Sequence, residues 1–457
     1  MTAFQTVVLG DFLKLYRIEH RVQDELTYKQ VTISKTKGIS FRGIKKGKDI
    51  GRKRQFKIDL DSYPNTLMFT RQGIFDGSIG IAPIEVNKCI VTENMPMMTI
   101  DTDIVEIDYL KKLLISKYLF KKIKNLKIVG SAQKSIHERD LLKITIKLPS
   151  KNDQIKMCKI FSSLDVYHSE LLLEFNNQQT ILKKLRQQIL QDAIEGKLTK
   201  DWRDQNSDIE PACELLKRIK AKKEELIKDK KINKQKALPA ITDDEKPFEL
   251  PETWEWCRLG EIITDTDSGW SPKCDENPAK KDSWGVLKTT AVQCMNFLPS
   301  KNKSLPSSLV ERENLEVKVG DILLTRAGPS NRVGICALVR KTPSKLMLSD
   351  KIIRFHPIDT LGGFMELFMG GRIFQGLIKN FKTGMAQSQV NISQANLKKV
   401  LIVLPSIQEQ HKILKKVEKL FAICDELEAQ ITSSQANSEE LMQAVLKEAF
   451  TQEDKVA

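Results

Sequence analysis

The feature that most constrains this fold is an internal repeat. When the sequence is shifted by 256 positions, LPSKNDQIK, which starts at Leu148, falls on LPSIQEQHK, which starts at Leu404. Further identities follow in the same register, without a gap, as far as Ala193 and Ala449. Such self-similarity indicates two copies of one structural unit. Because 457 residues are also too many for one ordinary domain, we expect the domains of this chain to come as a pair.

Both copies continue into a heptad pattern of apolar residues that predicts a long helix. In the first copy the pattern comprises Phe161, Leu164, His168, Leu171, Phe175, Gln178, Leu182, Leu185 and Ile189. In the second copy it comprises Val417, Leu420, Cys424, Leu427, Ile431, Ser434, Ser438, Leu441 and Val445. Steps of three and four are typical of a two-stranded coiled coil, so we expect the helices to pack antiparallel against each other. The polar positions Gln178 and Ser434 match and would fix the register. Two amphipathic helices packed on separate domains are the alternative.

The segment before each helix also repeats in outline. LMFTRQGIFDGSIGIAP (67–83) is similar to ILLTRAGPSNRVGICAL (322–338), and each predicts a strand, Thr-Arg, a glycine-containing turn and a second strand. The sequence thus predicts an α+β fold: two globular α/β domains in tandem, separated by two long helices that form an antiparallel coiled coil. The expected limits are 1–147 for the first domain, 148–197 for the first helix, 198–250 for a linker with a short charged helix, 251–403 for the second domain, 404–450 for the second helix and 451–457 for a tail.

The charge of the chain favours a polyanionic partner. The formal net charge is +15 at pH 7, which is typical of proteins that bind nucleic acid. A merely soluble basic protein is the alternative. The chain has no run of 18 apolar residues and no signal-peptide pattern at its start, so we expect no membrane segment and a cytoplasmic location. Its eight cysteines are scattered without a C-x-x-C pair, which predicts reduced thiols and no metal site.

The sequence lacks the common catalytic motifs. It has no phosphate-binding G-x-x-x-x-G-K-[ST] loop, no G-x-G-x-x-G and no H-E-x-x-H zinc motif. It also lacks the Asn/Asp-Pro-Pro-aromatic turn with which amino-methyltransferases hold their target amine. Glu316 and Lys318 resemble half of a nuclease site, but no upstream Asp pairs with them. We therefore expect a binding protein without catalytic residues rather than an enzyme.

Several stretches together resemble the DNA specificity subunit of type I restriction–modification systems. The most specific are LQDAIEGKLTKDWRDQN, ELLKRIKAKKEEL and KPFELPETWEWCRLGEI, which ends at Ile262. GDILLTRAG and QSQVNISQANLKKVLIVLPSIQEQHKI complete the second half. The first half is less regular, because Ser135 stands where the second copy has Asn391. The resemblance covers nearly the whole chain.

The resemblance implies a division of labour between subunits. Each of two target-recognition domains would read one half of a split site in double-stranded DNA, and the paired helices would fix the unread gap. Two modification subunits per copy would methylate adenine with S-adenosylmethionine. Restriction subunits would add translocation and cleavage that use ATP and Mg²⁺, so this chain would need no cofactor. A self-contained restriction or modification enzyme and a non-specific coiled-coil DNA-binding adaptor are the alternatives.

The candidate DNA-binding residues are cations and amides, the side chains that grip guanine and adenine edges. In the first domain they are Lys29, Gln30, Arg42, Lys46, Arg52, Lys53, Arg54, Arg71 and Gln72. In the second domain they are Lys288, Arg326, Asn331, Arg332, Lys382, Gln387, Gln389 and Asn391. The alternatives are that Arg71 and Arg326 bind a carboxylate inside their domains, and that Gln389 and Asn391 cap the following helix. Since the two sets differ, we expect two unlike half-sites.

The end of the first long helix is also predictable. Gly196 follows the last apolar positions and is expected to cap the helix. The next stretch, LTKDWRD, should pack Trp202 where the chain turns back. Trp254 and Trp256 should seat the second domain on the helical pair.

Overall fold

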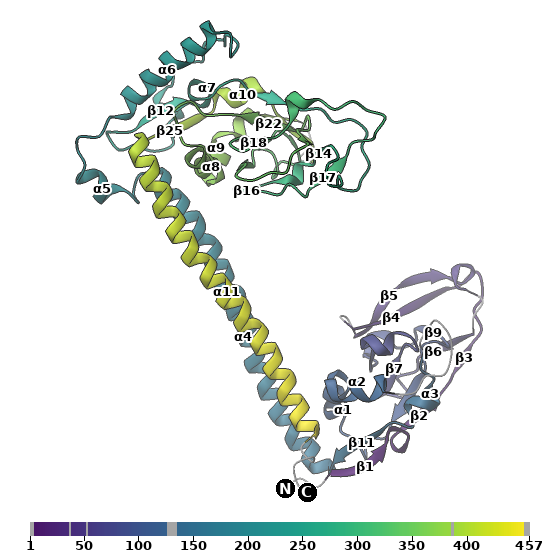
Figure 1. Cartoon of the computed structure of the whole chain (residues 1–457). Helices are drawn as coiled ribbons and strands as arrows, with labels where there is room; N and C mark the ends of the chain where they lie inside the picture. The colour runs from purple at the N-terminus through teal and green to yellow at the C-terminus, as the bar shows by residue number, and fades with distance from the viewer. Residues whose placement is uncertain (1–3, 36–37, 52–53, 126–134, 385–387, 452–457) are drawn as a thin grey trace. The chain divides into compact units, whose positions relative to one another are not determined.

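The computed structural model describes residues 4–35, 38–51, 54–125, 135–384 and 388–451. They form two compact units, Met1–Asn177 with Ile431–Ala457 and Gln178–Gln430, so the division passes through both long helices. Each unit contains a β-rich domain, and the helices α4 (Lys151–Ile194) and α11 (Ile407–Thr451) join the two domains (Figure 1). The predicted α+β class with two domains and two long paired helices is therefore confirmed.

The first unit is built on two larger sheets and a short strand pair. A four-stranded sheet has the order β2 (Leu13–Tyr16), β10 (Met97–Ile100), β7 (Thr66–Phe69), β8 (Ile79–Ile81). A five-stranded sheet has the order β3 (Glu19–His20), β6 (Gln55–Lys57), β9 (Ile90–Thr92), β4 (Thr27–Ser34), β5 (Gly38–Lys46). The remaining elements are the antiparallel pair β1 (Phe4–Val8) and β11 (Thr145–Pro149), and the helices α1 (Ile107–Ile115), α2 (Lys117–Lys124) and α3 (Glu138–Leu141). Strand β11 crosses the expected limit at 147.

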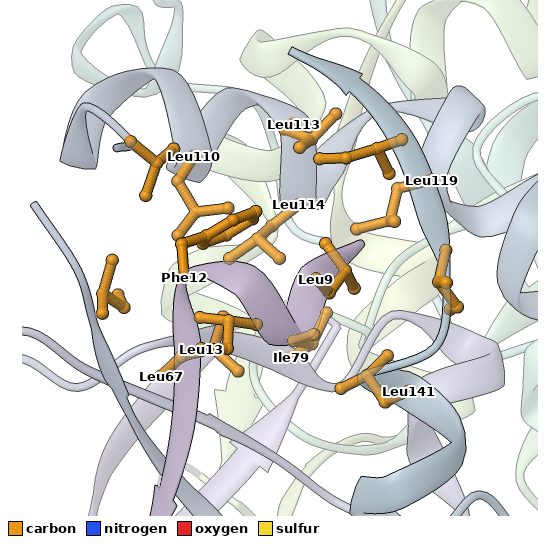
Figure 2. Packing of buried hydrophobic residues seen from close by; sticks show 14 of the residues in the cluster. Leu9, Phe12, Leu13, Leu67, Ile79, Leu110, Leu113, Leu114, Leu119 and Leu141 are labelled. Carbon is orange, nitrogen blue, oxygen red and sulfur yellow. The ribbon is translucent and has the colours of Figure 1, made fainter. Parts of the chain in front are cut away.

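The core of this unit lies between the four-stranded sheet and the helices α1 and α2. Figure 2 shows Leu110, Leu113 and Leu114 of α1 close to Phe12 and Leu9, all of them buried. The same apolar cluster takes in Phe161 of α4 together with Leu446 and Phe450 of α11. Burial of these side chains is the main force that attaches the domain to both helices.

The second unit repeats the four-stranded sheet, the antiparallel strand pair and the three helices of the first unit. We call these shared elements the frame, and the other sheets of the two units differ. Its four-stranded sheet has the order β13 (Asp267–Ser268), β22 (Ile352–Phe355), β18 (Ile322–Thr325), β20 (Cys336–Leu338). The pair β12 (Glu255–Arg258) and β25 (Leu401–Leu404) corresponds to β1 and β11, and the helices α8 (Gly362–Gly370), α9 (Arg372–Leu377) and α10 (Gln394–Lys399) correspond in order to α1, α2 and α3.

In place of the five-stranded sheet, the second unit has three small ones. Their orders are β17 (Asn302–Ser304), β14 (Gly285–Leu287), β21 (Leu346–Met347); β19 (Ala327–Gly328), β24 (Val390–Ile392), β23 (Lys382–Thr383); and β15 (Val292–Gln293), β16 (Asn296–Phe297). The two domains therefore share a frame and differ in the sheets attached to it.

The sequence repeat has a structural reason at its most conspicuous match. In the first turn of α4, the Gln154 side chain accepts a hydrogen bond from the Glu106 backbone N–H at 2.7 Å and donates to the Pro149 carbonyl at 2.9 Å. At the matching place in α11, the Gln410 side chain accepts from the Leu361 N–H at 3.0 Å and donates to the carbonyl of the proline before that helix. Both side chains are buried, so the amide must find both partners. Each glutamine thus pins its helix to the loop before α1 or α8.

The two long helices run antiparallel. In the first unit, the rings of Phe161 and Phe450 have centroids 5.9 Å apart, and His168 Nε2 lies 3.7 Å from Glu439 Oε2. Residue numbers rise along one helix as they fall along the other, as the predicted coiled coil requires. Helix α4 has 44 residues and helix α11 has 45.

The predicted seam is wrong at five positions, because Leu171, Leu185, Leu427, Ser434 and Leu441 are exposed. Leu171 and Leu441 are 47% and 64% exposed, whereas the next residues, Leu172 and Met442, are partly buried. The partly or fully buried positions of α4 include Phe161, Leu164, Asp165, His168, Leu172, Phe175, Gln178, Gln179, Leu182, Arg186 and Ile189. The corresponding positions of α11 include Val417, Leu420, Phe421, Cys424, Ile431, Gln435, Ser438, Met442 and Val445. The buried face of α4 thus keeps most of the predicted seam, with Leu172 and Arg186 in place of Leu171 and Leu185.

A polar residue explains part of this shift. Arg186 occupies a seam position that apolar patterning assigned to Leu185. Its Nη2 lies 2.6 Å from Asp425 Oδ1 and 3.0 Å from Glu428 Oε2, and its guanidinium lies over the Phe421 ring. Because an arginine can bury its stem and satisfy its charge across the helix pair, it takes a position that apolarity alone would deny it.

The first long helix ends as predicted. Its last helical residue is Ile194, and Gly196 adopts a left-handed conformation with φ +72°. The following short helix α5 (Lys200–Asp204) carries Trp202, which is partly buried. The chain thus turns back at a glycine cap.

A buried ion pair fixes this turn to the start of α11. Glu409 Oε1 accepts hydrogen bonds from Thr199 Oγ1 and Arg203 Nη1, both at 2.6 Å, and Oε2 accepts from Trp254 Nε1 at 2.7 Å. Trp254 therefore seats the second domain on the helices, as predicted. The linker begins with a charged helix, α6 (Ala212–Lys228), which was also expected.

Candidate nucleic-acid interface

Arg71 follows strand β7, where the sequence placed a candidate DNA contact. Its guanidinium pairs with Glu138 through Nε at 3.2 Å and Nη2 at 3.0 Å, and it is only 16% exposed. Arg17 Nη2 binds the same carboxylate at 2.6 Å. Burial alone would raise the pKa of Glu138, but backbone hydrogen bonding and the two guanidinium groups outweigh it and hold that pKa below its ordinary value. Arg71 thus has the internal carboxylate that was its alternative partner, and its DNA contact stays a prediction.

Arg326 occupies the equivalent place and lacks that partner. The backbone is the same in both domains: Ile136 N–H donates to the Arg71 carbonyl, and Ile392 N–H donates to the Arg326 carbonyl, each at 2.9 Å. The counterpart of Glu138 at the repeat offset is the neutral Gln394. Among the described residues no acceptor binds Arg326 Nε, which is buried. The charge of Arg326 is therefore less compensated than that of Arg71.

Two predicted residues of the second domain, Lys382 and Asn391, lie in the small sheet that begins directly after Arg326. Asn391 pairs with Ala327 across β19 and β24, and with Thr383 across β24 and β23. Lys382 Nζ donates to the Ser330 carbonyl at 3.3 Å, which brings β23 to the loop that carries the exposed Asn331; burial lowers the pKa of Lys382.

The amides of this sheet do not cap the next helix. Gln389 and Asn391 are exposed, while Ser393 is the N-cap of α10 and its side chain accepts from the Asn396 N–H. The capping alternative for Gln389 and Asn391 is therefore wrong, and these amides remain available to a ligand.

Two further candidates of the second domain lie apart from this sheet. Arg332 turns inward and donates to the Gln293 side chain at 3.0 Å and to the carbonyls of Thr289 and Val292. Its guanidinium is thus used to hold the domain together. Lys288 lines a cavity of about 370 Å³ with Lys303 and Lys351, which the sequence analysis did not single out. No motif connects these three lysines, because they lie on segments far apart in the chain.

In the first domain, the predicted residues concentrate on the strand pair β4 and β5. Lys29, Arg42 and Lys46 are exposed, and none forms an ion pair with a residue that the structure describes. Gln30 is partly buried, and its Nε2 has no hydrogen-bond partner among the described residues. Among the described candidate residues of this domain, those on β4 and β5 carry the most positive charge without an ion-pair partner.

The other candidates of the first domain are scattered. Gln72 is exposed beside Arg71, and Arg54 is exposed near β6, where its Nη1 lies 3.9 Å from Glu19 Oε1. Arg52 and Lys53 lie outside the described residues, as does Gln387 of the second domain.

The described residues offer no metal site and no membrane span. Within them, no three His, Cys, Asp or Glu side chains gather as metal ligands would. No helix in the described part of the chain is long and apolar enough to cross a membrane. All eight cysteines are free thiols.

Comparison with known proteins finds a family match over the second domain and part of its helix. Residues 251–434 match the family described as type I restriction modification DNA specificity domain. The specificity subunit of the type I restriction enzyme EcoEI from Escherichia coli is 49% identical over 269 residues, which is 58% of this chain and 45% of that protein. Residues 251–434 of this chain are thus similar to the type I restriction modification DNA specificity domain.

A second curated relative has a lower identity to this chain. The EcoAI specificity subunit from Escherichia coli is 31% identical over 281 residues, 58% of this chain and 44% of that protein. The matches thus span about half the length of these curated relatives. A chain solved in a study of complex assembly and conformational transition of the type I R-M system has the same fold, with a TM-score of 0.56 over 98% of both chains at 15% identity.

Proposed function

We propose that this chain is the DNA-reading subunit of a type I restriction–modification complex. Each β-rich domain reads one half of a split site in double-stranded DNA, and the chain itself catalyses no reaction. The observation that carries the proposal is the match to the specificity family over the second domain and its helix, at residues 251–434. The net charge of +15 fits a DNA ligand.

The proposed half-sites are unlike each other. The domains share the four-stranded sheet and the Thr-Arg turn, but a five-stranded sheet is attached to this frame in one and three small sheets in the other. A shared frame suits contacts with phosphates, which are the same at every base pair. Different sheets suit different base contacts, so the site should be asymmetric.

We further propose that the chemistry of the complex is carried out by partner chains. Modification subunits, two per copy, use S-adenosylmethionine to methylate an adenine that is flipped out of the duplex. Restriction subunits use ATP and Mg²⁺. The long helices offer a docking surface for these partners, since several of their apolar side chains are more than half exposed. These are Ile160, Val166, Tyr167, Leu173, Ile181 and Leu441. A cytoplasmic location follows from this assignment.

A selection experiment tests the proposal. The purified chain, alone and with its modification subunit, is mixed with random duplex DNA at low and raised salt, and the bound DNA is sequenced. Binding to phosphates alone fades as salt rises, whereas base contacts preserve a sequence preference. We expect enrichment of a split, asymmetric motif at raised salt. Binding that loses all sequence preference would instead support the non-specific adaptor.

The enzyme alternative has its own test. Incubation of the purified chain with labelled S-adenosylmethionine and DNA should transfer no methyl group unless the modification subunit is added. Transfer by the chain alone would contradict the proposal.

A further inference from the structure

The strand pair β4–β5 is a two-stranded ribbon at the edge of the first domain's five-stranded sheet (Figure 1). Strand β9 pairs with β4 only at Gln30, and β5 has no second neighbour in the described sheet. The outer part of the ribbon, from the pair Lys29–Ile44 to the pair Thr27–Lys46, therefore has no strand paired with it other than its own partner among the described residues. An unsupported ribbon of this kind is marginal in water unless something covers one face.

A bulge gives this ribbon an unusual face. Gln30 is opposite Gly43 and Val31 is opposite Phe41, so Arg42 is an extra residue without an opposite partner. Gly43 has φ +148°, a conformation that side chains rarely adopt. In a regular strand, residues 41 and 44 would point to opposite faces because they are three apart. The extra residue shifts the alternation by one and puts Phe41 and Ile44 on the same face.

The ribbon face that carries Phe41 and Ile44 is buried where it meets the core of the domain, and it is exposed beyond the core. Directly opposite residues share a face, so Phe41 lies beside Val31, and Ile44 lies beside Lys29. Val31 is buried in the core of the domain. In contrast, Phe41 is 46% exposed and Ile44 is 61% exposed. The apolar stripe thus continues past the core into solvent.

The charges around the stripe indicate what covers it. Lys29 and Lys46 are on the same face as Ile44, and Arg42 is held at the bulge. All three are exposed and form no ion pair with a described residue. Apolar side chains ringed by free cations suit a ligand that is anionic at its rim and apolar within. The major groove of DNA has this character, since phosphates border it and thymine methyl groups project into it.

We propose that the β4–β5 ribbon enters the major groove of the first half-site, with Phe41 and Ile44 against thymine methyl groups and Lys29, Arg42 and Lys46 on guanine edges or phosphates. This inference rests on the proposed function and names the element that reads. The groove, about 12 Å wide, admits a two-stranded ribbon. The three outer residue pairs extend about 10 Å at 3.3 Å per residue, more than the groove's depth of about 8.5 Å.

The first test maps methylated adenine in cells that carry the full chain and its modification subunit. Wild type is compared with Phe41→Ser and Ile44→Ser, and with Ile115→Ser as a matched control, because Ile115 is a 55% exposed isoleucine of α1 outside the ribbon. We expect the two ribbon variants to relax or abolish recognition of thymine in one half of the motif only. The other half and the control should keep the wild-type motif.

The second test measures binding to the mapped site with single thymines replaced by uracil, which removes only the methyl group. Wild type should lose affinity about fourfold at one or two thymines of the affected half, the effect expected for one buried methyl group. Phe41→Ser or Ile44→Ser should be insensitive to the same replacement. This readout does not depend on how well a variant methylates DNA.

Three outcomes would overturn the inference. Wild-type motifs and uracil responses in both ribbon variants would mean that the stripe does not touch bases. Failure of the ribbon variants to assemble with the modification subunit would make the stripe a protein-docking surface. Absence of any split motif in wild type would refute the proposed function, and the inference with it; a split motif in wild type with unchanged variants would refute the inference alone.

Discussion

The carboxylate of Glu409 offers the strongest single test of how the turn after α4 and the second domain are attached to the start of α11. It is 1% exposed and accepts hydrogen bonds from three segments: the turn after α4, the short helix α5 and the start of the second domain. Glu409→Ala would leave Arg203, only 14% exposed, without its counter-charge and would leave the hydroxyl and indole donors unsatisfied. Removing one partner of a buried ion pair typically costs about 3–5 kcal/mol. For a compact unit of this size, a loss of that free energy corresponds to a fall of roughly 10 °C in the unfolding temperature.

The measurement combines thermal unfolding with hydrogen exchange. The variant should unfold earlier, and the backbone amides of α5 and of the first turn of α11 should exchange faster than in wild type. Asp153→Ala is the matched control, since Asp153 stands at the repeat-equivalent position in α4 but binds only Ser150 and Lys156. It should change little. Replacing both Glu409 and Arg203 by leucine should recover much of the loss, because no unpaired charge then remains buried. Wild-type unfolding and exchange in Glu409→Ala would refute this reasoning.

Three further perturbations test the seam, the cap and the ion pair of the first domain. Leu172→Ala should lower the free energy of unfolding by about 1–2 kcal/mol and Leu171→Ala by less than about 0.5, as measured by urea denaturation; equal losses would contradict the shifted seam. Gly196→Ala should cost about 2 kcal/mol in the same assay, since it strains φ +72° and puts a Cβ 2.7 Å from Pro251 Cγ; a neutral effect would contradict the cap. Because the pKa of Glu138 is lowered on folding, its stabilisation is complete above its ordinary value of 4.5 and is lost as pH falls through the lower folded pKa. The difference in unfolding temperature between wild type and Glu138→Gln should therefore persist from pH 7 down to about 4.5 and shrink as the pH falls further, and a constant difference would count against the ion pair.

The sequence predicted the architecture because repetition and periodicity depend on backbone geometry and burial. The matched glutamines Gln154 and Gln410 make the same pair of hydrogen bonds in their two domains. The Thr-Arg stretches predicted a hairpin in each half, and β7–β8 and β18–β20 are those hairpins. These features can be predicted because they depend on local sequence and recur at a nearly constant spacing between the two copies.

The details of the helix pair were less predictable. Where leucines are adjacent, as at Leu171 and Leu172, both registers bury an apolar side chain, so patterning does not decide between them. Arg186 decides it through acidic partners on the other helix, Asp425 and Glu428, which lie more than 200 residues away in sequence. No periodicity within one helix contains that information.

The sequence also limited how much of the candidate site could be predicted. Arg71 and Arg326 look alike in sequence, yet within the described part of the chain only Arg71 has a carboxylate partner, because Glu138 is replaced by Gln394 in the second copy. Comparing the two copies at that position would have indicated the difference. The common face of Phe41 and Ile44 depends on a bulge at Arg42, and a spacing of three residues in a strand would have placed them on opposite faces.

Genome-wide mapping of methylated adenine is the most direct test of the central claim that this chain supplies the sequence specificity of its complex. Cells that express the modification subunit with the chain would be compared with cells that express it without the chain. The account predicts a split, asymmetric motif, methylated on both strands, that disappears when the chain is absent. Assembly of the complex without any such motif, or the same motif without the chain, would contradict it.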